Sequence, residues 1–510
     1  MLLTVFDCLL YLQKEGLVLT SSIEKVQNES IGGLSFDNRT IKKGEVFVCK
    51  GAAFRQEYLD RAIQAGALFY LSETVWKEDS PYIQVNDIRL AMAALAKAYY
   101  GEDAASLKKI GITGTKGKST VASFMNAILD DFHIAECGVP TALISSIFVY
   151  DGTIKEEAKL TTPEAMDLWR YLASAGKHGL DYAVCEVSSQ ALKYHRTKGV
   201  DFDVALFLNI GEDHISDVEH RDFEDYFQSK LSIFQSAKVA VINSSSDYYQ
   251  EIVSAAENAG CEIVSFGFQP SDTLYCVDIQ HLEAGTSFSA SWKGEEICFY
   301  EISLSGSYNV ENAMAALAVA KLFNLPEQHI KSGLLSAVAK GRGVHLCTDD
   351  KKITVIVDYA HNKMSMNALF SYVKEAFPNQ KIVSVFGAPG QKAKNRRADM
   401  GLVAGEFCDY VVITEDDPAA EPLADICAEI AENIAQKETP YEIIYERDVA
   451  IQKAFSLLED EGGVLLLCGK GAETSQKRKN GLEFYEGDEF YAKREIESYH
   501  KNKMLLSLLF

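Results

Sequence analysis

Gly111-Ile-Thr-Gly-Thr-Lys-Gly-Lys-Ser-Thr120 joins a short apolar stretch, 109–113, to an apolar run, 121–129. A strand, a glycine-rich turn and a helix in this order are the context that a phosphate-binding loop requires. The glycines let backbone N–H groups face an anion, and the helix N-terminus adds the positive end of its dipole. Lys118 is expected to reach the outer phosphates, and the hydroxyl of Ser119 or Thr120 to bind Mg²⁺. The alternative is an ordinary glycine turn before a helix.

The composition excludes several classes of protein. A chain of 510 residues predicts about three domains. A net charge of −23 argues against nucleic-acid binding, which needs a basic face. The 11 cysteines show no Cys-x-x-Cys pair, which indicates reduced thiols in the cytoplasm. We find neither a signal peptide nor an apolar run of the ~20 residues that span a membrane, so we expect a cytoplasmic monomer without membrane insertion.

The alternation of apolar stretches and amphipathic runs predicts an α/β protein. We expect a small N-terminal α/β domain over residues 1–105, which contains a polar turn at 35–39. A central domain with a mainly parallel sheet and the phosphate loop follows over residues 106–340. A C-terminal Rossmann-like domain over residues 341–510 has four apolar strands that each end in a polar or glycine-rich loop.

Candidate ligands stand where predicted strands end. Glu186 ends the strand 183–187, and His214 follows the strand 204–208. Because ligands in such folds lie beyond the carboxyl ends of the strands, both residues are expected near the phosphate loop, where they could bind Mg²⁺. Each by itself could equally be structural. Lys230, judged from its own helix alone, is expected at the surface. Asn309 and Asn312 share a helix face and could cap the helix or contact a base.

Taken together and in this order, the motifs resemble those of the Mur ligase family, over nearly the whole chain. Within the family, the chain is similar to the members that add the third amino acid to UDP-N-acetylmuramoyl-L-alanyl-D-glutamate. The resemblance implies a domain for the UDP part, a central ATPase and a C-terminal domain for the incoming amino acid. The implied ATP-binding residues are Gly114, Thr115, Lys116, Gly117, Lys118, Ser119, Thr120, Asn309, Arg342, Asp358 and His361. The implied contacts to the UDP-substrate are Asp37, Arg39, Thr161, Thr162, Ser188 and Arg196.

The same resemblance implies a metal centre. Glu186 and His214 match Mg²⁺ ligands of the family, beside Ser119 of the loop. Lys230 matches the family's modified lysine, whose carbamate bridges metals, and this replaces the surface position expected from the helix alone. Lys118, Glu186, His214 and Lys230 are therefore the implied catalytic residues.

The loop Asp416-Asp-Pro-Ala419 bears on the amino acid that is added. Family members that add meso-diaminopimelate have an arginine in the place of Ala419, which pairs with the far carboxylate of that substrate. Without it, Asp416, Asp417 and Glu473 favour a side chain that ends in an ammonium group, lysine first and ornithine second. Arg397, Lys392 or Arg396 is expected to hold the α-carboxylate.

The resemblance thus implies an ATP-dependent ligase of peptidoglycan synthesis that acts through an acyl phosphate and closes around ATP. The alternatives are ligation of ornithine or meso-diaminopimelate, and a related ligase such as folylpolyglutamate synthetase. A third is a catalytically silent ATP-binding scaffold of the cell-wall machinery.

Overall fold

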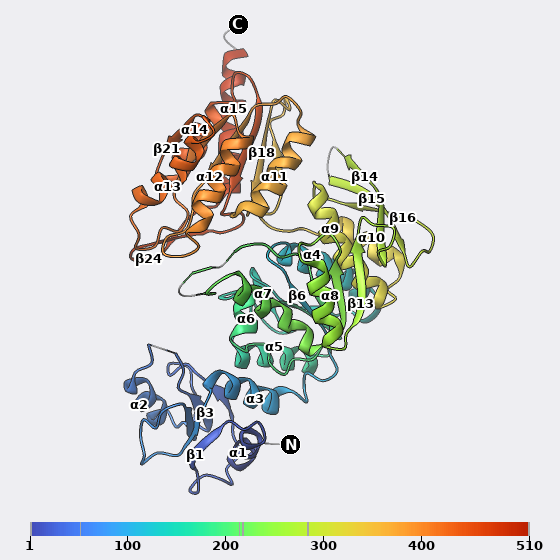
Figure 1. Ribbon diagram of the computed structural model, residues 1–510. Helices are drawn as coiled ribbons and strands as arrows, with labels where there is room; N and C mark the ends of the chain where they lie inside the picture. The colour runs from blue at the N-terminus through green and yellow to red at the C-terminus, as the bar shows by residue number, and fades with distance from the viewer. Residues whose placement is uncertain (1–2, 52, 214, 217–218, 283–284, 508–510) are drawn as a thin grey trace.

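The computed structural model describes residues 3–51, 53–213, 215–216, 219–282 and 285–507. Three main sheets follow one another along the molecule, from the blue N-terminal part to the red C-terminal part (Figure 1). Each sheet has helices packed against it, and the predicted three-domain α/β class is confirmed. No helix in the described part of the chain combines the length and the apolar character needed to cross a bilayer.

The N-terminal sheet has five strands in the order β1-β5-β4-β3-β2. Their bounds are Val18–Ser22 for β1, Gly33–Ser35 for β2, Glu45–Val48 for β3, Phe69–Ser72 for β4 and Tyr82–Val85 for β5. The helices are α1 (Val5–Lys14), α2 (Gln56–Gln64) and α3 (Ile88–Tyr100). Helix α3 starts where the carboxylate of Asp87 accepts the backbone N–H groups of Arg89 and Leu90.

The central sheet is built around the strand that leads into the phosphate loop. β6 (Lys108–Thr113) lies between β10 (Tyr182–Glu186) and β11 (Phe202–Phe207), and all three are parallel. The full order of the 11 strands is β16-β15-β14-β13-β12-β11-β6-β10-β7-β8-β9. The remaining bounds are Ala142–Ile144 (β7), Phe148–Tyr150 (β8), Lys155–Glu157 (β9), Ala237–Asn243 (β12), Glu262–Gly267 (β13), Leu274–Leu282 (β14), Gly285–Trp292 (β15) and Cys298–Ile302 (β16). The seven neighbouring strands β14-β13-β12-β11-β6-β10-β7 are parallel, and the strands at both edges of the sheet, β15 and β16 and also β8 and β9, pair antiparallel.

Helices cover both faces of the central sheet. One group comprises α4 (Lys118–Cys137), α9 (Ser307–Leu322) and α10 (Glu327–Ser336). The others are α5 (Ala165–Lys177), α6 (Ser189–Lys193), α7 (Phe223–Leu231), the 3₁₀-helix η1 (Ser232–Ser236) and α8 (Tyr249–Asn258). Residues 313–320 of α9 are all buried, because α4 and the strands enclose this helix. A continuous apolar cluster runs from α1 and α3 to α5, so the N-terminal and central sheets share one core.

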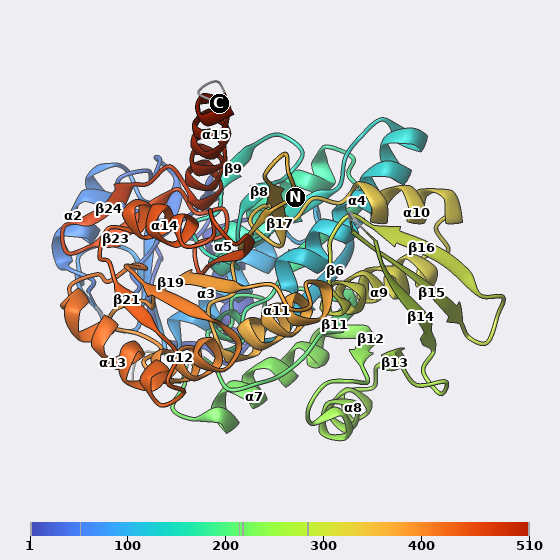
Figure 2. The same ribbon diagram turned by 90° about the horizontal axis from the view of Figure 1, so that it is seen from above.

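The C-terminal sheet has the order β17-β18-β22-β19-β20-β21, with only β17 antiparallel within it. The strands are β17 (Val344–Cys347), β18 (Ile353–Asp358), β19 (Ile382–Phe386), β20 (Tyr410–Ile413), β21 (Tyr441–Ile443) and β22 (Gly463–Cys468). Helices α11 (Lys363–Ala376), α12 (Asn395–Phe407) and α13 (Leu423–Ala435) cover one face, and α14 (Arg447–Ser456) and α15 (Asp488–Ser507) cover the other. A hairpin of β23 (Ser475–Arg478) and β24 (Gly481–Phe484) follows β22, and α15 carries the chain away from the body (Figure 2).

The linker between the central and C-terminal sheets passes close to the loop after β22. Gly341 has φ = 65°, and a Cβ atom there would lie 2.0 Å from the backbone nitrogen of Ala472. Only glycine fits, because the conformation is left-handed and the neighbouring backbone occupies the side-chain position. The linker therefore keeps the β22 loop next to the entry of the C-terminal sheet.

Candidate active site

The phosphate loop crosses from β6 to α4, as the sequence predicts. Gly117 is the N-cap of α4 with φ = 84°, and a Cβ atom there would lie 2.3 Å from Oδ1 of Asn312. The Nζ atom of Lys118 donates to the carbonyl oxygens of Gly114 at 2.8 Å and Thr115 at 3.3 Å. Burial lowers the pKa of Lys118. The loop thus holds a desolvated cation at the N-terminus of a helix, the arrangement that binds phosphate.

A hydroxyl and a carboxylate lie next to each other at the start of α4, beside the phosphate loop. Oγ of Ser119 donates to Oε2 of Glu186 at 3.0 Å, and Glu186 is buried at the end of β10. The backbone N–H of Ser146 donates to Oε1 of Glu186 at 2.9 Å. A hydroxyl and a carboxylate side by side form a donor set that suits Mg²⁺. Ser146 escaped the sequence analysis because no motif marks it.

Lys230 lies inside the molecule, so the surface position expected from its helix alone is wrong. Its side chain is 1% exposed, and Nζ donates to the carbonyl oxygen of Gly114 at 2.9 Å. Burial, followed by the charge of Lys118, brings its pKa well below the usual range for lysine. The helix α7 turns this residue toward the phosphate loop, together with Tyr226, whose hydroxyl lies 3.0 Å from Oγ1 of Thr115.

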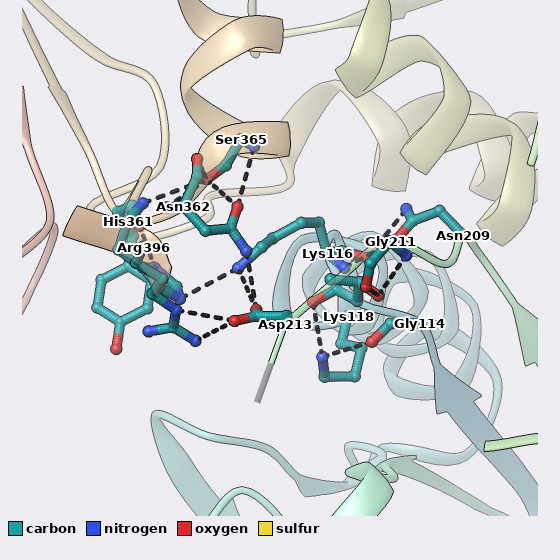
Figure 3. Close-up of polar contacts among 12 residues, drawn as sticks. Gly114, Lys116, Lys118, Asn209, Gly211, Asp213, His361, Asn362, Ser365 and Arg396 are labelled. Carbon is teal, nitrogen blue, oxygen red and sulfur yellow. Dashed lines mark hydrogen bonds and ion pairs between the residues drawn. The ribbon is translucent and has the colours of Figure 1, made fainter. Parts of the chain in front are cut away.

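A buried carboxylate joins the central sheet to the C-terminal sheet (Figure 3). Oδ1 of Asp213 accepts from Nε of Arg396 at 2.8 Å, and Oδ2 accepts from Nδ2 of Asn362 at 2.8 Å. Lys116 of the phosphate loop lies 3.4 Å from the same carboxylate and 3.1 Å from Nε2 of His361. Burial lowers the pKa of Lys116 to about 7. His214, the next residue after Asp213 and an implied metal ligand, lies outside the described residues.

A cavity of about 260 Å³ opens beside the loop between the two sheets. Of the implied ATP contacts, it is lined by Lys116, Gly117, Thr120, Asn309, Arg342 and Asp358. Asp358 accepts the backbone N–H of Gly343 at 2.7 Å and that of Ala360 at 2.8 Å, so it is fixed at the end of β18. Lys116 and Thr120 come from the central domain, and Arg342 and Asp358 come from the C-terminal domain. The cavity is therefore complete only when the two domains are in contact.

The implied contacts to the UDP-substrate form two groups. Near Glu186, Oγ1 of Thr162 accepts from the backbone N–H of Ser188 at 3.0 Å, and Nη1 of Arg196 donates to the Thr162 carbonyl at 3.2 Å. Thr161 is half-buried beside them. Glu164 links this group to the N-terminal sheet, because it pairs with Arg196 at 3.1 Å and with Lys50 at 2.8 Å.

The second group lies on the N-terminal sheet. Nη2 of Arg39 pairs with Oδ2 of Asp37 at 2.6 Å, while Nε of Arg39 lies 2.9 Å from Oδ1. The Arg39 side chain is exposed, and the bidentate pair lowers the pKa of Asp37 to about 2. The structure brings these two residues together, and the ring of Phe36, next to Asp37, lies 4.6 Å from Nζ of Lys50, the residue that pairs with Glu164.

The predicted acidic cluster already contains a lysine. The Nζ atom of Lys470, which is 0% exposed, donates to Asp417 at 2.7 Å and to Glu473 at 2.9 Å, and lies 3.7 Å from Asp416. Burial raises the pKa of Asp416 to about 6. Ala419 has φ = 54° and donates its N–H to Lys477 on β23. Three carboxylates against one ammonium leave the cluster negative, and Lys470 was missed because two of its partners, Asp416 and Asp417, come from another loop.

A tyrosine connects this cluster to the nucleotide cavity. The hydroxyl of Tyr359 donates to Oε1 of Glu473 at 2.9 Å, and the guanidinium of Arg342 lies 4.5 Å from the Tyr359 ring centre. The ring of His361 packs edge-on against the ring of Tyr359, with 4.5 Å between the two ring centroids. One aromatic ring therefore touches residues of both sites.

The three cationic residues expected to hold the α-carboxylate of the amino acid have different partners in the structure. The guanidinium of Arg397 is buried and paired with Glu421 at 2.8 Å and Glu429 at 3.0 Å. Arg396 is occupied by Asp213. Lys392 is exposed on the same loop. In this structure the ion pairs of Arg397 hold α12 to Glu421, which follows the Ala419 loop, and to Glu429 of α13.

A phosphate loop, a carboxylate–hydroxyl pair below it and a second doubly wound sheet with an acidic cluster define an ATP-dependent ligase of two or more substrates. Comparison with known proteins agrees. Residues 112–320 match the family model "Mur ligase middle domain", and residues 341–471 match "Mur ligase, glutamate ligase domain". Two relatives are named UDP-N-acetylmuramoyl-L-alanyl-D-glutamate–L-lysine ligase. That of Enterococcus faecalis is 36% identical over 94% of both chains, and that of Streptococcus mutans is 36% identical over 89% of this chain and 90% of its own.

Solved structures share the fold. A UDP-N-acetylmuramoyl-L-alanyl-D-glutamate–2,6-diaminopimelate ligase aligns over 98% of this chain and 100% of its own, with a TM-score of 0.64 and 23% identity. MurF of Thermotoga maritima in complex with ADP aligns over 92% of this chain and 98% of its own, with a TM-score of 0.61 and 17% identity. The chain belongs to the Mur ligase family, and it is an ATP-dependent amide ligase.

Proposed function

We propose that this protein joins L-lysine to the D-glutamyl carboxyl group of UDP-N-acetylmuramoyl-L-alanyl-D-glutamate, with hydrolysis of ATP, in the synthesis of peptidoglycan precursors. The observation that carries the choice of amino acid is the negative cluster of Asp416, Asp417 and Glu473 next to Ala419. The names of the relatives from Enterococcus faecalis and Streptococcus mutans support the same substrates.

Residues 1–105 are proposed to bind the UDP end, with Asp37 and Arg39 in contact with it. Thr161, Thr162, Ser188 and Arg196 then hold the peptide end next to Glu186. Lys50 and Glu164 support this arrangement, because their ion pair ties the N-terminal sheet to the central domain, 106–340. Residues 341–510 are proposed to bind the amino acid.

ATP is proposed to bind with its phosphates on residues 114–120 and its nucleoside in the cavity lined by Asn309, Arg342 and Asp358, with His361 nearby. Ser119 and Glu186 fit a Mg²⁺ site, since their oxygens meet at 3.0 Å, and His214 is proposed as a further ligand. Bound Mg²⁺ would neutralise charge on the transferred phosphoryl group.

Lys230 is proposed to carry a carbamate that orders the metal centre. The depressed pKa of its amine supports this, because only a neutral amine attacks CO₂. Incubation with ¹³C-bicarbonate should give a carbamate signal in the NMR spectrum that Lys230→Gln lacks. An identical spectrum for both proteins would remove the carbamate from the mechanism.

The chemistry then has two steps. The D-glutamyl carboxylate attacks the γ-phosphorus of ATP, and the bond to the ADP oxygen breaks, which yields an acyl phosphate and ADP. The ammonium group of Lys118 stabilises the negative charge on the phosphoryl group while it is transferred. The lysine α-amine next attacks the acyl carbon, loses its proton and releases phosphate, and nearby cations stabilise the oxyanion of the tetrahedral intermediate.

In the amino-acid site, the substrate's ε-ammonium is proposed to meet Asp416, Asp417 and Glu473. Lys470 fixes two of these carboxylates and leaves a net charge that still attracts a cation. For the α-carboxylate, the exposed Lys392 is better placed than Arg397 or Arg396, since both arginines are committed to ion pairs. We further propose a cytoplasmic monomer.

The alternatives differ in what they predict. Ornithine has a shorter chain to the same ammonium, whereas meso-diaminopimelate would bring a carboxylate to a negative cluster. A folylpolyglutamate-type ligase is less favoured, because a structure of that class covers only 74% of this chain. Phosphate release from ATP should be measured with the UDP-dipeptide and L-lysine, L-ornithine or meso-diaminopimelate in parallel. Release with lysine and a matching tripeptide is expected; release with diaminopimelate alone would overturn the specificity.

A further inference from the structure

A second group of ligand atoms lies at the opposite end of the phosphate-loop helix. His133 and Cys137 are one turn apart on the last part of α4, so they share a helix face. Asp181 stands directly before β10. One ligand atom from each of these three residues lies within 4.8 Å of the other two. Lys118, at the loop end of α4, stands 15 residues before His133, which is about 22 Å along the helix axis, so this group is separate from the ligase site.

The hydrogen bonds of His133 show which nitrogen is available for a ligand. The side chain is 2% exposed, and Nδ1 lies 3.0 Å from the carbonyl oxygen of Val139. A carbonyl oxygen only accepts, so Nδ1 carries a proton. In the neutral ring, Nε2 then carries a lone pair, and it lies 2.6 Å from Oδ2 of Asp181. Two such atoms repel at this distance unless a cation lies between or beside them.

A proton fits the present 2.6 Å between Nε2 and Oδ2, whereas a metal ion, at about 2.0–2.2 Å from each ligand atom, needs a wider separation, which the exposed Asp181 side chain can provide by turning outward. A proton would make an ion pair of His133 and Asp181 and would give Cys137 no part in it. A metal ion uses all three residues. The carbonyl of Val139 then has the role usual for a histidine ligand, because it holds the other ring nitrogen and fixes the tautomer. The C-terminal end of α4 also favours a cation through the helix dipole.

We propose that His133, Cys137 and Asp181 bind a divalent transition metal of the Zn²⁺ class. The set of one nitrogen, one sulfur and one oxygen suits Zn²⁺, which takes imidazole, thiolate and carboxylate ligands, and it does not suit Mg²⁺. Cys137 is exposed and the Asp181 side chain is 62% exposed, so both can adjust to the metal while His133 stays fixed. A fourth position faces solvent. The ion would connect the end of α4 to the start of β10.

The structure offers a matched control for the test. Among the described residues, Cys137 and Cys347 are the exposed cysteines. Cys347 lies on β17 of the C-terminal sheet, away from the proposed metal site. The full-length protein is stripped of metal with a chelator, and alkylation of each cysteine by iodoacetamide is followed by peptide mass spectrometry with and without Zn²⁺. We expect Zn²⁺ to slow alkylation of Cys137 by about tenfold or more, because a metal-bound thiolate is a poor nucleophile, and to leave Cys347 unchanged.

Co²⁺ provides a second readout that does not depend on ligase activity. A thiolate-to-Co²⁺ absorption band is expected in the unaltered protein and in Cys347→Ser, and it should be absent in Cys137→Ser. Asp181→Asn keeps the size of the side chain but removes its charge next to His133, and should weaken Co²⁺ binding by about tenfold or more. Equal alkylation of Cys137 with and without Zn²⁺, or a band that survives in Cys137→Ser, would leave a His133–Asp181 ion pair and overturn the proposal.

Discussion

The carboxylate of Asp213 and the guanidinium of Arg396 meet across the boundary between the central and C-terminal sheets, with 2.6 Å between Oδ1 and Nη2. Asp213 is fully buried, and the Arg396 side chain is 8% exposed. Because Lys116 of the phosphate loop faces the same carboxylate, the contact between the sheets also positions a residue of the nucleotide site. This pair therefore connects the contact between the two sheets to the nucleotide site.

Arg396→Leu should loosen the contact between the central and C-terminal sheets. Removing one partner leaves Asp213 buried without its guanidinium, which costs about 3–5 kcal/mol, and separating the two sheets relieves that cost. We expect a larger radius of gyration in small-angle X-ray scattering and a higher KM for ATP. Arg221→Leu, whose side chain is 84% exposed, serves as the control. If Arg396→Leu scatters like the unaltered protein, the pair does not hold the sheets together.

Lys118→Ala separates an enzyme from a silent ATP-binding scaffold. The Lys118 amine is the cation nearest the outer phosphates in the proposed complex, so we expect ATP-dependent turnover to fall by about 10³-fold. Phosphate release in the presence of all substrates is the measurement. Lys238→Ala, an exposed lysine paired with Asp203, should leave turnover unchanged. Full activity in Lys118→Ala would contradict the role of the loop.

Lysine binding should strengthen as the pH rises through 6. The free carboxyl of Asp416 has a pKa of about 6, so at lower pH it is neutral and attracts no ammonium group. Below that pKa the affinity, measured by calorimetry, should fall by up to about tenfold per pH unit. Since the folded-state pKa lies above the usual 3.8, the stability that Asp416 contributes is complete below about pH 4 and is lost as the pH rises through 6.

Asp416→Asn should remove this pH step, while Asp425→Asn, an exposed residue of α13, should keep it. The same step in Asp416→Asn would assign it to another group of the amino-acid site.

Gly341→Ala tests whether the linker must touch the β22 loop. The added methyl group would lie 2.0 Å from the Ala472 nitrogen, so the linker has to move away from the loop that carries Glu473. We expect a higher KM for lysine and a lower Tm. Gly294→Ala is the control, because Gly294 also has a left-handed φ of 75° but has open space around it. Equal effects of the two substitutions would mean that backbone strain alone, and not the contact, matters.

The sequence predicted the fold class, because parallel strands buried on both faces are continuous apolar runs. Motifs with a local geometry, such as residues 114–120, were also placed correctly. Lys230 was misjudged from its helix alone, since its partner, the carbonyl of Gly114, is 116 residues away.

Charge pairing across loops is the part that the sequence could not supply. Arg397 looked available for a substrate carboxylate, yet Glu421 and Glu429 of a later segment occupy it. Asp416, Asp417 and Glu473 looked like an open acidic site, yet Lys470 sits among them. In each case residue type and spacing gave the charges, and only the folded arrangement decides which charges neutralise one another.

Tyr359 has a consequence for how the two substrates influence each other. Its ring packs on Arg342 at the nucleotide cavity, and its hydroxyl binds Glu473 at the acidic cluster. Any shift of this ring that one ligand causes changes the free energy of binding the other. Thermodynamic linkage makes that effect reciprocal: the factor by which ATP changes the affinity for the amino acid equals the factor by which the amino acid changes the affinity for ATP.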